Sequence, residues 1–278
     1  MHTEELTAAL SRGEDSRQLF RVAFASADET LIPSMTLADV SVPLLDQYLE
    51  KVWGETLDQV GLPLGTLLEN MNLADGGRLN LAGALLFARH PEFKLPAFIV
   101  KAVAFAGTDI TDQNYLDSRD LTGPLPEIFE QGMRFLVGNT RTLQNGRSVN
   151  SLGEPEVPRI VWEELLANAL IHRDYFVSAP VRLLIFADRV EIISPGHLPN
   201  NLTIANIKAG NSNIRNPILA SFATKLLPYR GLGSGLLRAL KAYPAIELID
   251  DRAGNLFRAI VTRPPATAPD GVVAAAGI

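Results

Sequence analysis

Three polar residues, Glu164, Asn168 and His172, are spaced four apart, and their types could do phosphate chemistry. On a helix this spacing places them on one face as a polar stripe. An acidic group and a carboxamide one turn apart can hold a hydrated Mg²⁺ and orient a water toward a phosphate, because Mg²⁺ binds few protein oxygens and keeps several waters. The alternative is a solvated glutamate and an asparagine that caps something nearby, since such polar pairs are common on helices. The spacing leaves both interpretations open.

A glycine-rich run, Gly231-Leu232-Gly233-Ser234-Gly235, precedes an expected helix from Leu237 to Ala242. Glycines allow backbone N–H groups to turn toward an anion, and a helix N-terminus adds a favourable dipole. The run therefore suits a phosphate cradle, although an ordinary turn has the same composition. It is neither a Rossmann fingerprint nor a Walker loop, because the last gap and the lysine are missing. Ser234 also does not fit a G-x-S-x-G nucleophile elbow.

Between these two motifs lie a tight loop and a polar segment. Residues 194–199, from Ser194 through Gly196 to Pro199, follow an expected strand, and their Pro and Gly residues favour a loop that a ligand can approach closely. The asparagine-rich stretch 200–216, which includes Asn211, tolerates left-handed backbone and suits a lid over a ligand. An ordinary surface loop is the alternative.

Hydrophobic patterning predicts the elements that must position these residues. Helical periodicity marks Arg159 to His172 after Pro158, and apolar β-branched flanks around residues 187–189 predict a hairpin. Further expected helices are 44–53, 65–71 and 127–137, further expected strands are 95–105, 246–249 and 256–262, and residues 81–87 suit either type. The chain divides into a mainly helical segment 1–76, a small α/β unit 77–148, a site-bearing unit 149–264 and a disordered tail 265–278.

Composition limits the class of protein. The chain has 278 residues, 47% hydrophobic and 20% charged, with no cysteine and a net charge of −6. Disulfides and thiolate metal sites are excluded, and the first twenty residues are too charged for a signal peptide. No apolar run has membrane-spanning length. We therefore expect a soluble, cytoplasmic protein with no membrane partner, and the dispersed basic residues argue against unaided DNA binding.

The order of these motifs resembles the GHKL ATPase module of gyrase, the large heat-shock chaperones and histidine kinases. The likeness is greatest to the GHKL-like domain of bacterial RecG-related, Schlafen/AlbA-containing transcriptional regulators. It is carried by EELLANALIHRDY (163–175), DRVEIISPGHLP (188–199), GNSNIRNP (210–217) and YRGLGSGL (229–236), with RLNLAGALLFARHPE (78–92) ahead of them. The resemblance implies an α+β fold whose C-terminal domain is a two-layer α/β sandwich. Residues 1–16 resemble the opening of the Schlafen/AlbA-like domain, most of which is absent.

The resemblance also implies roles for residues. Glu164 would activate water and, with Asn168, hold Mg²⁺, and Gly196 would lie beneath the adenine of ATP. The glycines at 231, 233 and 235 would surround the phosphates. Ser194 replaces the usual adenine-binding aspartate and Leu198 the second glycine, and a neutral acceptor makes a weaker bond than a charged one. The full set of expected ligand-binding residues is Glu164, Asn168, His172, Ser194, Gly196, Asn211, Gly231, Gly233, Ser234 and Gly235.

Two functions follow from this interpretation. The first is an ATP-binding regulatory module, with slow Mg-dependent hydrolysis at most and no helicase motor. The second is a degenerate, non-catalytic fold that serves protein interaction or dimerisation. The resemblance implies a homodimer, and contact with nucleic acid only through the domain that is largely missing.

Overall fold

The computed structural model of the protein describes residues 26–143 and 153–265. The expected Schlafen/AlbA-like remnant at 1–16 and nearly all of the tail at 265–278 lie outside the described residues. Within the described part no helix is both long and apolar enough to cross a bilayer.

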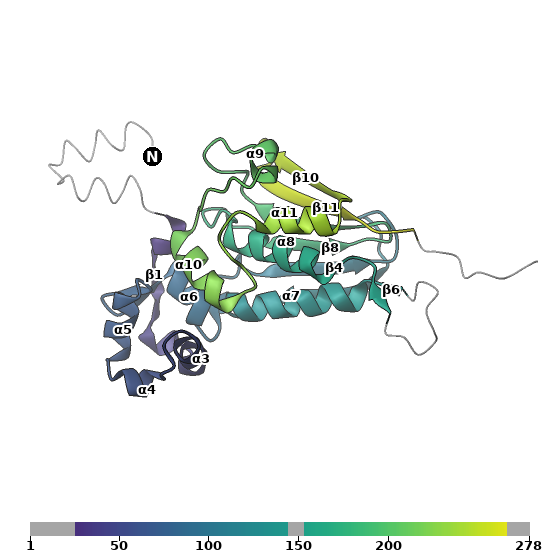
Figure 1. Cartoon of the computed structure of the whole chain (residues 1–278). Coiled ribbons are helices and arrows are strands. Elements are labelled where there is room, and N and C mark those ends of the chain that lie inside the picture. The colour runs from purple at the N-terminus through teal and green to yellow at the C-terminus, as the bar shows by residue number, and fades with distance from the viewer. Residues whose placement is uncertain (1–25, 144–152, 266–278) are drawn as a thin grey trace, which may run out of the picture.

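The dominant element is a six-stranded mixed sheet with helices on one face (Figure 1). The strands run in the order β10-β11-β9-β8-β4-β5, and neighbouring strands are antiparallel except for the parallel pair β4 and β8. The predicted α+β two-layer sandwich is confirmed. Its strands are β4 (Val100–Phe105), β5 (Tyr115–Leu121), β8 (Val181–Ile185), β9 (Arg189–Pro195), β10 (Ile246–Asp251) and β11 (Leu256–Thr262), and its helices include α7 (Leu125–Asn139), α8 (Arg159–Ile171) and α11 (Gly235–Ala242).

The pattern of β8 shows which face the helices cover. On β8, Val181, Leu183 and Ile185 are buried in the main core, whereas Arg182 is partly exposed and Leu184 belongs to a separate small cluster with Phe105, Phe186 and Ile193. Successive strand residues point to opposite faces, so the first three meet the helices. On the helical side α7 and α8 approach closely at Gly132, where an added Cβ would lie 2.7 Å from Leu166 Cδ2.

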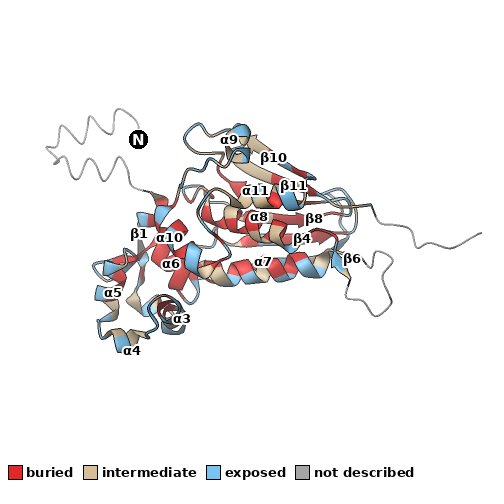
Figure 2. Ribbon diagram, viewed as in Figure 1, coloured by how far each residue is buried: buried red, intermediate tan, exposed pale blue. Residues whose placement is uncertain are grey.

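Helix α8 is buried on nearly all sides, as Figure 2 shows in red. It packs against α7, α11 and β9. Glu164, which the helical pattern places on a polar border, is therefore buried at 2% exposure, because α11 covers it.

A smaller body precedes the sandwich. It contains a three-stranded sheet in the order β1-β3-β2, and a turn at Gly76-Gly77 joins β2 to β3 with positive φ at both glycines. Its elements are β1 (Leu31–Thr36), α3 (Val42–Trp53), α4 (Leu57–Val60), α5 (Leu64–Asn70), β2 (Ala74–Asp75), β3 (Arg78–Asn80) and α6 (Leu81–Phe87), with short 3-10 turns η1 (Ala27–Glu29), η2 (Leu37–Asp39) and η3 (Pro91–Phe93).

Helix α10 (Pro217–Leu226) joins this body to the sandwich. The rings of Tyr48 on α3, Phe87 on α6 and Phe222 on α10 form one aromatic cluster, with centroids 5.1–6.0 Å apart. The remaining elements are β6 (Thr142–Leu143), which pairs with β7 (Glu154–Pro155), and α9 (Ile204–Lys208).

Four points of the sequence analysis need correction. The strand expected from Leu95 begins at Val100, because Pro96 lacks a donor and the backbone around it closes turns at Leu95 and Phe98. The segment expected to be mainly helical contains β1, and β5 was not expected. The sheet also crosses the boundary expected near residue 148, since β4 pairs with β8, which follows the boundary, and β5 pairs with β4.

Candidate functional site

A cavity of about 1060 Å³, counting its open mouth, lies between α8, the ends of β9 and β11, and the segments 196–213 and 229–238. Its lining includes nine of the residues expected to bind a ligand: Glu164, Asn168, His172, Ser194, Gly196, Asn211, Gly231, Gly233 and Gly235. The fold thus brings together motifs that lie up to about seventy residues apart in the chain. Ser234 is the exception, because it does not line the cavity.

Part of the cavity lining is apolar, and we refer to it as the apolar slot: Leu165 and Ala169 of α8, Ile192 of β9, and Phe257 and Ala259 of β11. Ligand pockets combine such apolar walls with a few well-placed polar groups. A flat aromatic base suits this slot.

Ser194 supplies a polar group within this slot. Its side chain is buried, and its hydroxyl donates to the carbonyl of Ala169 at 3.1 Å. A serine hydroxyl has one proton and two lone pairs. Because the proton is already engaged, Ser194 can only accept from a ligand, and an exocyclic amino group is a matching donor.

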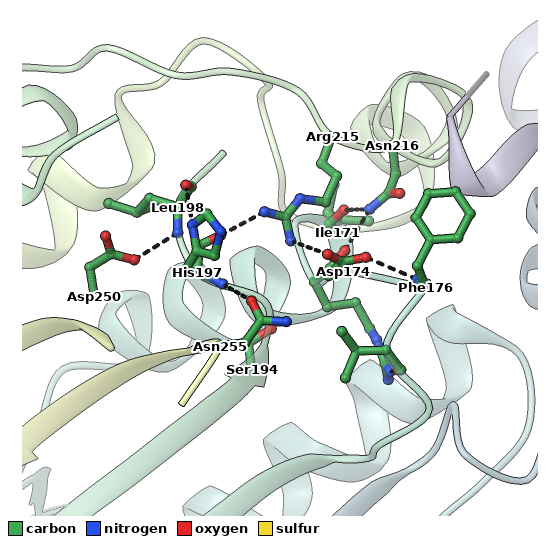
Figure 3. A network of polar contacts seen from close by, with 12 residues as sticks. Ile171, Asp174, Phe176, Ser194, His197, Leu198, Arg215, Asn216, Asp250 and Asn255 are labelled. Atoms are coloured by element: carbon green, nitrogen blue, oxygen red, sulfur yellow. Dashed lines mark hydrogen bonds and ion pairs between the residues drawn. The ribbon is translucent and has the colours of Figure 1, made fainter. Parts of the chain in front are cut away.

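The loop after β9 is held by a polar network that the sequence analysis did not identify (Figure 3). The His197 amide donates to Asn255 Oδ1 at 3.1 Å, and the Leu198 amide donates to Asp250 Oδ1 at 2.7 Å. Arg215 donates to the His197 carbonyl at 2.6 Å. The β10–β11 hairpin thus fixes the loop at the cavity wall, and its partners are 52 to 58 residues distant in sequence.

Neighbouring side chains leave no room for a side chain at Gly196. Its φ is +97°, and an added Cβ would lie 2.5 Å from Asp174 Cβ and even closer to the Arg215 guanidinium. Arg215 and Asp174 form an ion pair at 3.5 Å beneath it. The residue lines the cavity as expected, but the packing of these two side chains already explains why it is glycine.

His172 is a neutral group at neutral pH. Burial lowers its pKa to about 4, with a smaller contribution from the positive charge of Arg215. Its Nε2 lies 3.0 Å from the Tyr229 hydroxyl. Burial, helped by the negative charge of Glu164, raises the pKa of Tyr229. The His172–Tyr229 pair therefore contributes uncharged hydrogen-bonding groups to the cavity wall.

Glu164 forms a buried ion pair with Arg238 of α11. Arg238 Nε donates to Glu164 Oε1 at 3.0 Å, and Arg238 Nη2 donates to the same oxygen. The side chain of Glu164 is 2% exposed and that of Arg238 is 31% exposed. The sequence analysis did not single out Arg238, which lies 74 residues after its partner.

The glycine loop packs tightly against these groups. A Cβ at Gly235 would fall well inside 3.0 Å of Glu164 Oε2, and one at Gly233 would fall equally close to the Gly210 carbonyl. Gly231 and Gly233 both have positive φ. Ser234 Oγ accepts from Arg238 Nη1 at 2.8 Å, so its hydroxyl supports the guanidinium instead of lining the cavity.

Asn168 and Asn211 also line the cavity. The Asn168 side chain is partly exposed, and it has no hydrogen-bond partner among the described residues. The Asn168 carboxamide oxygen is thus available to a ligand in the cavity and is of a type that binds Mg²⁺. Glu164 does not fit as a direct metal ligand, because its Oε1 is held by a cation. The described residues contain no group of three or more His, Asp or Glu that could hold a metal ion.

Comparisons with known proteins agree with this architecture. Residues 178–252 match an HATPase-type family model described as "Putative ATP-dependent DNA helicase recG C-terminal". The crystal structure of the DIP2311 protein from Corynebacterium diphtheriae is similar to 89% of this chain, with 23% sequence identity and a TM-score of 0.63. The chain spans 50% of that protein's length, and at this identity the likeness concerns the fold. No curated protein matches the chain. The sandwich fits a GHKL-like ATP-binding fold that is related to the RecG C-terminal model.

Proposed function

We propose that the sandwich binds an adenine nucleotide, ATP, in the cavity between α8 and the glycine loop. The observation that carries this proposal is Ser194. Its hydroxyl proton is committed to Ala169, so the oxygen offers only lone pairs inside an apolar slot. The adenine amino group is a donor that matches this arrangement.

Other parts of the lining suit the phosphates. Asn168 of α8 is next to Ala169 of the slot in sequence, and Gly231 and Gly233 line the cavity without side chains. Mg²⁺ bound to the nucleotide would neutralise phosphate charge, and the Asn168 carboxamide is an oxygen that this chain offers to it. The lining thus includes groups that suit adenine and groups that suit phosphates, which supports the proposal.

Binding, not turnover, is the activity that this geometry supports. A general base must reach a water molecule with a free lone pair. The carboxylate of Glu164 is buried and bonded through Oε1 to Arg238, and Gly235 lies directly against Oε2. We propose that the nucleotide acts as a regulatory ligand in a bacterial regulatory protein of the RecG-related type, as the family match suggests.

A second candidate is a fold used only for protein interaction, with no nucleotide. The Glu164–Arg238 pair favours it, because a self-satisfied ion pair removes charge from the cavity. Ser194 also favours this candidate, because it is neutral where the family has an acidic residue. The two candidates differ in one measurable respect, which is whether a nucleotide stabilises the protein.

The test combines thermal unfolding with calorimetric titration of ATP, GTP and adenosine. A ligand that binds only the native state raises stability by RT ln(1 + [L]/Kd). We expect ATP to bind more tightly than GTP, because guanine carries a carbonyl where adenine carries the amino group. Ser194→Ala should weaken adenosine binding by roughly fivefold, the equivalent of one hydrogen bond of about 1 kcal/mol.

The matched control is Ser221→Ala on α10. Ser221 also donates to a helix carbonyl, that of Ile218 at 2.7 Å, but it does not line the cavity. This variant should bind adenosine as the wild type does. No stabilisation of the wild type by millimolar ATP would contradict the proposal and favour the interaction module.

A further inference from the structure

We propose that Arg238 is the polyphosphate-binding residue of the cavity and that Glu164 competes with the phosphate for it. The expected ligand is the di- or triphosphate tail of a nucleotide. This inference deepens the proposed function and rests on it for the identity of the base, but the anion site can be tested by itself. It assigns Glu164 the role of an internal counter-ion, not that of a base or a metal ligand.

The position of Arg238 supports this role. It lies in the first turn of α11, directly after the glycine loop, and it lines the same cavity as Asn168 and Gly233. Its side chain is 31% exposed, whereas that of Glu164 is 2% exposed, so the guanidinium is the accessible partner of the pair. Arg238 is therefore the partner that is more open to an entering anion.

The guanidinium also has donors to spare. Arginine carries five N–H donors in a planar fork. Two of them bond Glu164 Oε1 and one bonds Ser234 Oγ. The other two N–H groups remain for a ligand, and a guanidinium fork matches the geometry of phosphate oxygens. Ser234, though outside the cavity wall, holds the fork in place.

The charges explain why Glu164 should oppose binding. Among the described residues that line the cavity, Glu164 is the acidic one, and Arg238 and Arg230 are the basic ones. Arg230 is exposed at the rim, and His172 is neutral. A phosphate at Arg238 must share the guanidinium with a buried carboxylate that Gly235 holds in place. The like charge of Glu164 therefore weakens phosphate binding until it is removed.

The experiment is calorimetric titration with inorganic tripolyphosphate, adenosine and ATP, in buffer with EDTA and again with Mg²⁺. The variants are Glu164→Gln, which keeps a hydrogen-bond acceptor for Arg238, and Arg238→Gln. The double variant Glu164→Gln/Arg238→Gln removes both charges and leaves no unpaired buried ion, which otherwise destabilises a fold. Circular dichroism and thermal unfolding verify that each variant is folded, and Arg238→Lys replaces Arg238→Gln if the latter is not.

In EDTA, we expect Glu164→Gln to bind tripolyphosphate at least about tenfold more tightly than the wild type. Arg238→Gln and the double variant should bind it at least about tenfold more weakly. These factors are the size expected for one charge-assisted hydrogen bond. Arg238→Lys should keep part of the affinity. Adenosine should bind equally to all variants. The matched controls are Glu163→Gln and Arg159→Gln, which change the same charges in the exposed ion pair of the same helix, outside the cavity. Both controls should behave as the wild type.

The inference is overturned if Arg238→Gln binds tripolyphosphate as the wild type does, if Glu164→Gln binds it more weakly, or if neither the wild type nor Glu164→Gln binds it at all. A weaker Glu164→Gln only in the presence of Mg²⁺ would instead identify Glu164 as a metal ligand. Failure of the proposed function gives a different result. In that case adenosine would not bind, and ATP would bind no more tightly than tripolyphosphate. The two ideas can therefore fail separately.

Discussion

His172 is a residue whose pKa is changed by its burial at the cavity. The sequence analysis placed it in a polar stripe with Glu164 and Asn168, and all three line the cavity. The structure adds that His172 is neutral and contacts Tyr229. Its protonation should therefore oppose folding in mildly acidic solution.

The expected pH dependence has a definite sign. The pKa of His172 is about 4 in the folded protein and about 6.5 when unfolded, so between these values the unfolded chain binds more protons. This contribution to stability is present above pH 6.5 and is lost as the pH falls toward 4. His172→Gln, which can keep a hydrogen bond to Tyr229, should remove that part of the dependence. Each pKa unit corresponds to about 1.4 kcal/mol, so the effect is a few kcal/mol at most.

The measurement is urea unfolding of both proteins at several pH values from 4 to 7. Carboxylates titrate in the same range, but they are common to both proteins, so the difference between the two curves isolates His172. Parallel curves would show that the histidine is not buried in the folded state.

Residue types and spacing identified nine of the residues that line the cavity, because short motifs carry their own chemistry. They did not predict that Glu164 forms an ion pair with Arg238. Arg238, Asp250 and Asn255 reach the site from elements far along the chain, and no local pattern encodes such partners. Gly235, the first residue of α11, carried a partial signal, since a glycine at a helix start indicates that something approaches closely.

At the scale of elements, hydrophobic periodicity was sufficient for α3, α7, α8 and the hairpin of β8 and β9. Strand β5 was missed because its residues are nearly all exposed, so no alternation marks it. Strand β1 was missed because Pro33 interrupts its pattern. Residues 81–87 fit a helix or a strand by composition, and tertiary packing decides for the helix α6, which is buried along its whole length.

Helix α6 depends on a glycine for its contact with the preceding segment. A Cβ at Gly83 would fall well inside 3.0 Å of the Leu73 carbonyl, which is backbone and cannot rotate away. Gly83→Ala should therefore lower the free energy of unfolding by roughly 1–3 kcal/mol through overpacking.

The control for this variant is Gly138→Ala in α7, where nothing lies within 4 Å of an added Cβ. Alanine there should raise stability by up to about 1 kcal/mol, because it favours helix and restricts the unfolded chain. Chemical denaturation measures both. If the two substitutions shift stability in the same direction, the contact with Leu73 is not what requires glycine at position 83.

At the scale of the whole molecule, the sheet joins segments that the sequence analysis assigned to separate units. Strand β4 pairs in parallel with β8, and α7 packs against α8. Hydrophobic periodicity identifies strands but does not say which strands pair across eighty residues. The expected units 77–148 and 149–264 therefore share one sheet and one core.

A fragment that begins at residue 153 should consequently not fold by itself. It would expose the edge of β8 and the face of α8 that α7 covers, including Leu166. We expect the fragment 153–265 to lack a cooperative unfolding transition, whereas the fragment 26–265 retains one, as measured by circular dichroism during heating. A cooperative transition in the shorter fragment would show that β4 and α7 are dispensable.

The two margins of the sheet carry charges. Strand β5 bears Asp117, Arg119 and Asp120, and β10 bears Glu247 and Asp251. Charged side chains on edge strands discourage pairing with another chain. These charges therefore oppose the joining of two copies through their sheet edges, which is the contact that leads to fibrous aggregation.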